Sequence, residues 1–165
     1  MKNKKLLIIL GVSIIIIIGL ILIFSSNNAS EKLSVECERN ASVNGFDSNF
    51  LVQVYRDGDL LKLILTNENK MGEKLLSQFS SLDNLAKVYD AQQKEQIEKT
   101  FGENYEYVES NVESTNSSVI VKNTYYINEK SSESIYVAFD YNFFEATNED
   151  IKNYFERDGY SCKVY

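Results

Sequence analysis

The sequence predicts an α+β protein in which an N-terminal transmembrane helix is followed by an antiparallel sheet with two helices packed on one face. Three observations support this class. Residues 6–24 form an uncharged apolar run, several later segments alternate apolar and polar residues, and apolar residues recur every three or four positions within 75–101 and 151–155. Alternation is typical of half-buried strands, and the longer period is typical of amphipathic helices.

The apolar run 6–24 is long enough to cross a bilayer. At about 1.5 Å per residue it spans roughly 28 Å, close to the thickness of the hydrocarbon core. Three lysines within residues 1–5 precede it and an acidic chain follows, so the positive-inside rule predicts a cytoplasmic N-terminus and an extracellular C-terminal domain. A cleavable signal peptide is the alternative, but its apolar core is shorter, at about 7–15 residues, and Asn27-Asn28-Ala29 does not match its A-x-A pattern. We therefore predict a single-pass protein of the cell membrane.

Residues 25–32 are small and polar and predict a spacer, and residues 33–165 predict one extracytoplasmic α+β domain. Beyond the lysines of the cytoplasmic tail, 14 of the 17 basic residues remain against 24 acidic ones, a net charge of −10. This balance argues against nucleic acid and against an anionic lipid surface as partners, because both attract basic patches. The absence of histidine excludes Ser-His-Asp and Cys-His catalysis and imidazole metal sites.

The first part of the domain predicts three strands. Leu33, Val35 and Cys37 alternate on one face of the first strand. Asp57-Gly58 is a strong hairpin signal between the next two strands. One face of these two strands is predicted to carry Phe50, Val52, Val54, Leu61, Leu63 and Leu65.

A helix follows these strands. Its apolar stripe runs through residues 75–101, and Gly102 is placed as its C-terminal stop. A break near Ser80 would divide the stripe into two helices, with Ser81 capping the second.

After Gly102 the strand pattern returns. Residues 105–112 and 118–127 predict a second hairpin, and Ile135, Val137, Phe139 and Tyr141 predict a further strand with these residues on one face. Thr147 then begins a second helix that ends at Asp158-Gly159, and residues 160–165 predict a last short strand.

The two cysteines, Cys37 and Cys162, lie near the two ends of the domain. An even number of cysteines in an oxidising compartment predicts a disulfide, here between the first and last strands. Two separate buried thiols are the alternative.

The architecture resembles the YehR-like small bacterial envelope lipoproteins, a family without an established function. The resemblance rests on "YRDGDLLK" early in the domain, a helix leading into a tyrosine-rich strand pair, "FDYNFF" before the last helix, and Gly159-Tyr160 after it. It covers most of residues 50–165 and implies an envelope location. This chain lacks the lipid-modified cysteine of such proteins, so a membrane helix would replace that anchor, and no functional residue is carried over.

Catalytic signals are weak in this chain. Asp140 with Glu145, or Asp57 with Asp59, are candidate acid/base pairs, but carboxylates so close in sequence at turns and strand ends are usually solvated. Neither an EF-hand loop nor, in the outer domain, an S-x-x-K motif is present. We predict no catalytic, cofactor-binding or metal-ligating residue and no enzymatic activity.

The aromatic content is more informative. Adjacent Tyr125 and Tyr126 must point to opposite faces of one strand. Tyr126, Lys122 and Thr124 are therefore predicted to form a row on the sheet face turned away from the helices. This row is the predicted binding surface, because an exposed tyrosine can anchor a peptide or a glycan. The alternative is ordinary sheet surface, since tyrosine also suits the outer face of any sheet.

The abundance of lysine, asparagine, isoleucine and tyrosine is typical of an AT-rich bacterial genome. We predict a membrane-anchored module of the bacterial envelope that binds an envelope protein or a cell-wall component, without a cofactor. A carboxylate-based envelope hydrolase is one alternative, and a structural subunit of a membrane complex is another. Converging carboxylates in a cleft would favour the hydrolase.

Overall fold

The computed structural model describes residues 31–43, 46–72, 76–77 and 81–165. Lys32–Tyr165 form one compact unit, which begins one residue before the predicted domain boundary. The predicted transmembrane segment 6–24, the tail 1–5 and most of the spacer lie outside the described residues. Within the described ranges, no helix has both the length and the apolar character needed to span a membrane.

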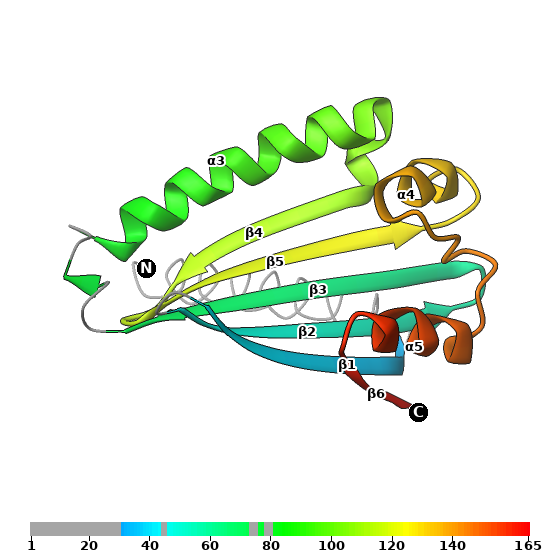
Figure 1. Ribbon diagram of the computed structural model, residues 1–165. Helices are drawn as coiled ribbons and strands as arrows, with labels where there is room; N and C mark the ends of the chain where they lie inside the picture. The colour runs from blue at the N-terminus through cyan, green and yellow to red at the C-terminus, as the bar shows by residue number, and fades with distance from the viewer. Residues whose placement is uncertain (1–30, 44–45, 73–75, 78–80) are drawn as a thin grey trace, which may run out of the picture. The chain divides into compact units, whose positions relative to one another are not determined.

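The domain is built on a six-stranded sheet (Figure 1). Its strands are β1 (Lys32–Val43), β2 (Phe46–Asp57), β3 (Leu60–Met71), β4 (Val108–Ser114), β5 (Ser118–Ile127) and β6 (Ser161–Val164). They are ordered β4-β5-β3-β2-β1-β6, and every neighbouring pair is antiparallel. The predicted α+β class with an antiparallel sheet is confirmed for this part of the chain.

Helices cover one face of this sheet, which we call the helix face (Figure 1). They are α3 (Leu82–Phe101), α4 (Ser132–Phe139) and α5 (Asn148–Arg157), and a 3-10 helix, η1 (Gly102–Tyr107), leads from α3 into β4. Ile97 of α3, Ile135 of α4 and Ile151 of α5 are all buried in the same core cluster. The prediction of two helices on one face is therefore incomplete, because α4 is a third helix on that face.

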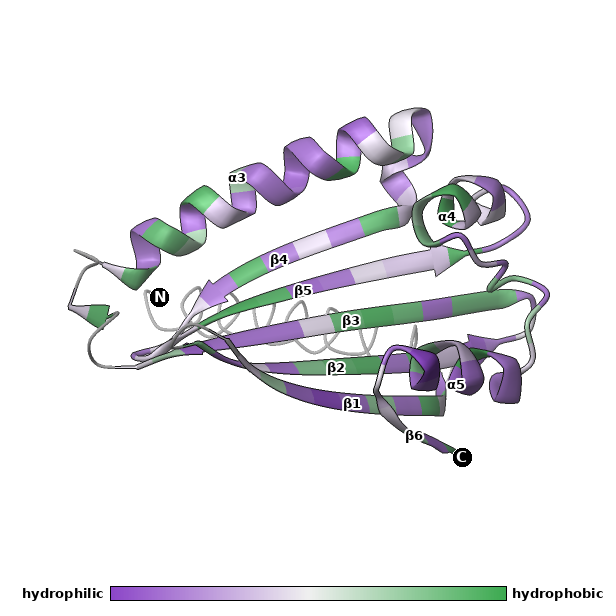
Figure 2. Cartoon of the chain, viewed as in Figure 1, coloured by the Kyte–Doolittle hydropathy of each residue, from purple (hydrophilic) through white to green (hydrophobic). Residues whose placement is uncertain are grey.

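The core is concentrated at one end of the sheet. Val54, Leu63 and Ile127 are fully buried beneath α4 and α5, where burial of each such side chain contributes roughly 1.5–3 kcal/mol. Figure 2 shows β3 changing from hydrophobic at this end to hydrophilic at its other end. A smaller cluster of Met71, Ala86 and Val119 lies toward that other end.

Several local predictions are confirmed. Asp57 pairs with Leu60 across the β2–β3 turn, and Gly58 has a φ of 57°, which a residue without Cβ adopts at little cost. Ser81 caps α3 by accepting a hydrogen bond from the Asn84 N–H, and Gly102 ends the helix with a φ of 54°. The part of the predicted helical stripe before Ser81 falls largely outside the described residues.

The predicted strand at Ile135–Tyr141 is wrong, because Ile135, Val137 and Phe139 lie in α4, and Tyr141 follows the end of that helix. Ile135 and Phe139 are four positions apart and fit a helical period as well as an alternating one. Ile135 is 1% exposed and Val137 is 71% exposed, so the two do not share a buried face. Asp140 ends the helix in the left-handed conformation, with a φ of 53°.

Two smaller corrections concern strand starts. A register shift between Leu33 and Val35 pairs Leu33 with Tyr55 and Val35 with Val54, so Leu33 does not share the inward face of Val35 and Cys37 as predicted. Such a bulge places two residues opposite one and reverses the alternation locally. The second predicted hairpin exists as β4 and β5, but residues 105–107 belong to η1 rather than to the strand.

Candidate functional site

The row predicted as a binding surface lies on the sheet face opposite the helices. Lys122, Thr124 and Tyr126 pair in β3 with Thr66, Ile64 and Lys62, respectively, which confirms their alternation along β5. Lys122 is exposed and Tyr126 is half-buried, but Thr124 is only 7% exposed. The row therefore offers less contact area than three protruding side chains would.

Tyr126 is already engaged within this surface. Its hydroxyl donates a hydrogen bond to Glu109 on β4 at 3.0 Å. The Lys62 ammonium lies 5.8 Å from the centre of the Tyr126 ring and 6.0 Å from that of Tyr55, within the range of a cation–π contact.

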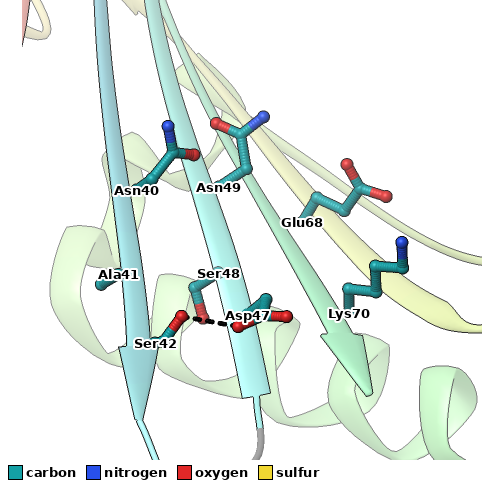
Figure 3. Close-up of a pocket in the computed structure, with 8 residues that line it drawn as sticks. All are labelled: Asn40, Ala41, Ser42, Asp47, Ser48, Asn49, Glu68 and Lys70. Carbon is teal, nitrogen blue, oxygen red and sulfur yellow. Dashed lines mark hydrogen bonds between the residues drawn. The ribbon is translucent and has the colours of Figure 1, made fainter. Parts of the chain in front are cut away.

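A polar hollow occupies the end of the sheet formed by β1, β2 and β3 (Figure 3). Asn40, Asn49 and Glu68 are cross-strand neighbours there. Ser42 donates a hydrogen bond to Asp47 at 2.6 Å (Figure 3). Within the described ranges, no three histidine, cysteine, aspartate or glutamate side chains gather closely enough to hold a metal ion.

The carboxylate pairs considered from the sequence all lie at the surface. Asp57 and Asp59 flank the β2–β3 turn and are exposed. Asp140 ends α4, and Glu145 accepts a hydrogen bond from the Asn142 amide at 2.9 Å. Both are exposed, so neither pair has the enclosed surroundings of an acid/base site.

A groove on the helix face was not anticipated from the sequence. One cavity of about 390 Å³ lies over β2, β3 and β5 and reaches α3, α4 and α5. A second cavity of about 290 Å³ continues along β3, β5 and α3. The two share Asn69, Tyr89 and Val121, so we treat them together as the helix-face groove.

Aromatic rings line much of the groove. They belong to Phe46, Phe50, Tyr89, Phe139, Tyr154, Phe155 and Tyr160. Tyr154 donates a hydrogen bond to the Phe139 carbonyl at 3.0 Å, which ties α5 to the end of α4. Burial raises the pKa of Tyr154 above its ordinary value of 10.0, an effect to which the nearby Asp158 carboxylate adds. Tyr154 packs edge-on against Phe155, and Phe155 packs edge-on against Tyr160, so contacts between rings fix this wall.

Arg39 packs against two aromatic residues that line the groove. Its guanidinium lies between the rings of Phe50 and Tyr160, 4.7 Å from each ring centre. Its Nη1 donates a hydrogen bond to the Asp158 carbonyl at 2.8 Å. Asp158 is the only charged side chain among the described residues that line the groove, and Arg39 bonds its backbone carbonyl rather than its carboxylate.

The floor carries amide side chains between apolar ones. Asn67 and Asn69 follow Leu65 on the inward face of β3, and Asn123 is directly opposite Leu65 on β5. The Asn123 amide donates a hydrogen bond to Gln93 of α3 at 3.4 Å. Gln93 therefore joins the α3 wall to the floor.

Some polar atoms of this region are buried without a partner. Within the described part of the chain, these atoms are Arg39 Nε, Asn67 Oδ1, Ser110 Oγ and Asn123 Oδ1. Asn67 and Asn123 both line the groove, and Ser110 is the cross-strand neighbour of Asn123 on β4. A buried acceptor without a hydrogen bond costs about 1–3 kcal/mol. Both amide oxygens are sealed from solvent, so a ligand in the groove would not reach them in this conformation.

One sequence signal could have located this floor. The inward positions of β3 read Leu61, Leu63, Leu65, Asn67 and Asn69, so apolar residues give way to amides at positions that face the helices. A polar residue at an inward position is an exception to the strand pattern and commonly has a functional reason.

In comparisons with protein-family models, with curated proteins and with solved structures, this chain matches none. The class of the domain therefore rests on its own architecture, an antiparallel α+β domain with a groove between its sheet and its helices.

Proposed function

We propose that this protein is a membrane-anchored extracytoplasmic binding module that holds its ligand in the helix-face groove. The observation that carries the proposal is the helix-face groove itself, whose two cavities share Asn69, Tyr89 and Val121 and are lined by aromatic rings. Aromatic walls would supply contact area at low entropic cost.

The location forms part of the same proposal. Residues 6–24 anchor the chain in the cell membrane, and the lysines before them place the domain outside. The Cys37–Cys162 disulfide supports this orientation, because disulfides persist mainly in oxidising compartments. The resemblance to YehR-like envelope lipoproteins is consistent with an envelope location.

Binding is favoured over hydrolysis by the chemistry of the groove. A carboxylate-based hydrolase uses two carboxylates that converge on the substrate. Among the described lining residues, the groove has one carboxylate, that of Asp158, and its remaining side chains are aromatic, aliphatic, amide or hydroxyl groups.

Tyr89 allows a direct test. It lines both cavities of the groove and is 40% exposed, so Tyr89→Ala should remove ligand contact without unfolding the domain. Tyr136→Ala is the matched control, because Tyr136 is 48% exposed on α4 and is not among the groove residues. The full-length protein and both variants, in nanodiscs, would be used to recover ligands from the envelope of the producing cell. We expect Tyr136→Ala to behave as the wild type and Tyr89→Ala to lose the recovered ligand. Equal recovery by Tyr89→Ala would contradict the groove as the binding site.

A further inference from the structure

We infer that the edge of β1 beyond β6, residues 39–43, binds an extended basic peptide segment of a partner protein as an added strand. We call these residues the β1 free edge. Neither Asn40 nor Ser42 is among the described residues that line the helix-face groove, so this second site goes beyond the proposed function. The inference rests on three features: an open row of backbone groups, the lack of the charges that usually protect such an edge, and a carboxylate beside it.

β6 covers only part of β1. β1 extends to Val43, but β6 pairs only with residues 35–38. Among the described residues, no strand pairs with residues 39–43 on that side, whereas β2 pairs with them on the other side. At about 3.3 Å per residue the β1 free edge is roughly 16 Å long, enough to pair with about five residues of a peptide.

The backbone groups of Asn40 and Ser42 point away from β2 at this edge. Cys37 and Cys162 have Cα atoms 4.0 Å apart, the close spacing of a pair that exchanges no backbone hydrogen bonds. Successive residues of a strand direct their N–H and C=O groups to opposite sides, so Cys37 bonds toward β2 and Glu38 toward β6. By the same alternation, Asn40 and Ser42 direct these groups to the β6 side, beyond the end of β6. Both residues are exposed, so an added strand can reach their backbone groups.

The β1 free edge lacks the features that usually protect an open strand from pairing. Natural sheets place charged residues or proline at such edges. At the opposite edge of the sheet, β4 exposes Glu109 and Glu113, and β6 exposes Lys163. Residues 40–43, by contrast, read Asn-Ala-Ser-Val, with neither a charge nor a proline. Within the described sheet, this edge is therefore the one best suited to accept a further strand.

The charge beside the edge favours a basic segment. Glu38 is exposed on the same face of β1 as Asn40, and within the described part of the chain it forms no ion pair. A lysine or arginine opposite Asn40 in an added strand would be a diagonal neighbour of Glu38, within reach of a long side chain. Asn40 pairs with Asn49 and Asn49 with Glu68, which adds a second carboxylate to this face (Figure 3).

The net charge of the chain argues against a second copy at this edge. Two chains that each carry a net charge of −10 beyond the tail lysines repel one another, whereas a basic segment is attracted. Arg39 does not reverse this preference at the outer face, because its guanidinium packs on the helix face between Phe50 and Tyr160.

The experiment presents a random library of peptides of about seven residues, long enough to cover the β1 free edge, to the full-length protein in nanodiscs. We expect the selected peptides to be enriched in lysine and arginine. Asn40→Pro removes the outward N–H and should weaken their binding by about tenfold or more, whereas Asn40→Ala keeps the backbone and should bind as the wild type. Proline is tolerated where the N–H of an edge strand faces away from its partner. If no peptide is selected, or none is sensitive to Asn40→Pro, the inference is overturned.

N-methylation of a selected peptide tests the added strand on the wild-type protein, so the result does not depend on the folding of a variant. In an added strand only alternate N–H groups face β1. We expect methylation to weaken binding by about tenfold at every second position and to have little effect at the positions between them. A peptide held by charge alone would show no such alternation, and that result would overturn the strand pairing.

Glu38→Gln tests the preference for a basic segment. It should weaken binding of a selected basic peptide by about two- to fivefold, in keeping with an exposed ion pair. Glu113→Gln is the matched control, because it removes the same charge from β4 at the opposite edge of the sheet. Equal effects of the two variants would overturn the placement of the basic residue beside Glu38. Self-association of the wild-type protein that Asn40→Pro abolishes would assign the edge to a second copy of this chain and overturn the peptide.

Discussion

Cys37 lies directly opposite Cys162 across β1 and β6, with their Cα atoms 4.0 Å apart and their sulfurs bonded at 2.08 Å. The predicted disulfide is thus confirmed. β6 comprises four residues and pairs with β1 at its outer edge. The bond joins positions 125 residues apart and holds this short strand on the sheet.

Removal of the disulfide is expected to destabilise the domain. The Cys37→Ala/Cys162→Ala double variant should lower the free energy of unfolding by about 2–5 kcal/mol, because the open chain has more conformational freedom when unfolded. Urea denaturation followed by circular dichroism measures the change. The oxidised wild type should also be about two mass units lighter than its reduced form, since disulfide formation removes two hydrogens. A variant with an unchanged unfolding midpoint would show that the bond adds nothing to stability.

The Thr147 cap of α5 makes an acid-dependent contribution. Thr147 accepts a hydrogen bond from the Asp150 N–H, and the Asp150 carboxylate accepts from the Thr147 hydroxyl and N–H. The hydrogen bond from the Thr147 hydroxyl lowers the pKa of Asp150 below 3.8, and the weaker effect of the bond from the Thr147 N–H acts in the same direction. The stabilisation is therefore present above about pH 3.8 and is lost as the pH falls through the lowered pKa.

Thr147→Ala tests this cap. It should lower the free energy of unfolding by about 1 kcal/mol at neutral pH, as loss of an N-cap does. It should also return the pKa of Asp150 toward 3.8, which carboxyl NMR titration measures. Ser132→Ala in α4 is the comparison. The Ser132 hydroxyl donates a hydrogen bond to the Glu129 carbonyl, and this bond does not involve α5. An Asp150 pKa that does not move would contradict the hydrogen-bonded cap.

Burial of the Tyr125 hydroxyl should make the domain less stable at high pH. Tyr125 is 8% exposed, and burial raises its pKa above 10.0, an effect that a hydrogen bond with Asn123 opposes. Above pH 10 the unfolded chain loses this proton while the folded domain retains it, so stability falls as the pH rises through the raised pKa. Tyr125→Phe should reduce this alkaline loss in unfolding measured between about pH 9 and 12. Identical alkaline profiles for the two proteins would contradict the assignment to Tyr125.

Variants of Tyr126 test which of two surfaces binds the ligand: the Tyr126–Thr124–Lys122 row or the helix-face groove. Tyr126→Phe removes the hydroxyl bond to Glu109 and should cost about 1 kcal/mol or less at this exposed pair. Tyr126→Ala should leave ligand recovery unchanged, since Tyr126 lies on the face opposite the groove. If Tyr126→Ala lost the ligand while Tyr89→Ala retained it, the Tyr126–Thr124–Lys122 row would be the binding surface.

The membrane topology remains a prediction from the sequence. Protease added to intact cells should remove residues beyond about Ser25 and spare the segment 6–24, because the lysines before that segment keep the N-terminus inside. Digestion after cell lysis is the control for protease access. A domain that is protected until lysis would mean that the orientation is reversed.

Local chemistry explains which elements could be predicted. The Asp57-Gly58 turn, the Ser81 and Thr147 caps and the Gly102 stop depend on residues adjacent in sequence, and each was correctly located. The cysteine pair was also correct, because only one intramolecular pairing exists for two cysteines. α4 was not predictable in this way, because Ile135 and Phe139 fit both periods.

The sequence by itself therefore determined the α+β class, the hairpins, the caps and the disulfide partners, since each follows from short-range conformational preference or from a unique pairing. The tertiary structure alone decided that α4 is a helix, that Thr124 is covered by its neighbours, and that Asn67 and Asn123 meet on one floor beneath α3 and α5. The physical reason is that these features depend on which residues lie across neighbouring strands and under the helices. The register between β3 and β5 brings Leu65 and Asn123 together although they are more than 50 residues apart in the chain. No local sequence pattern encodes such a pairing.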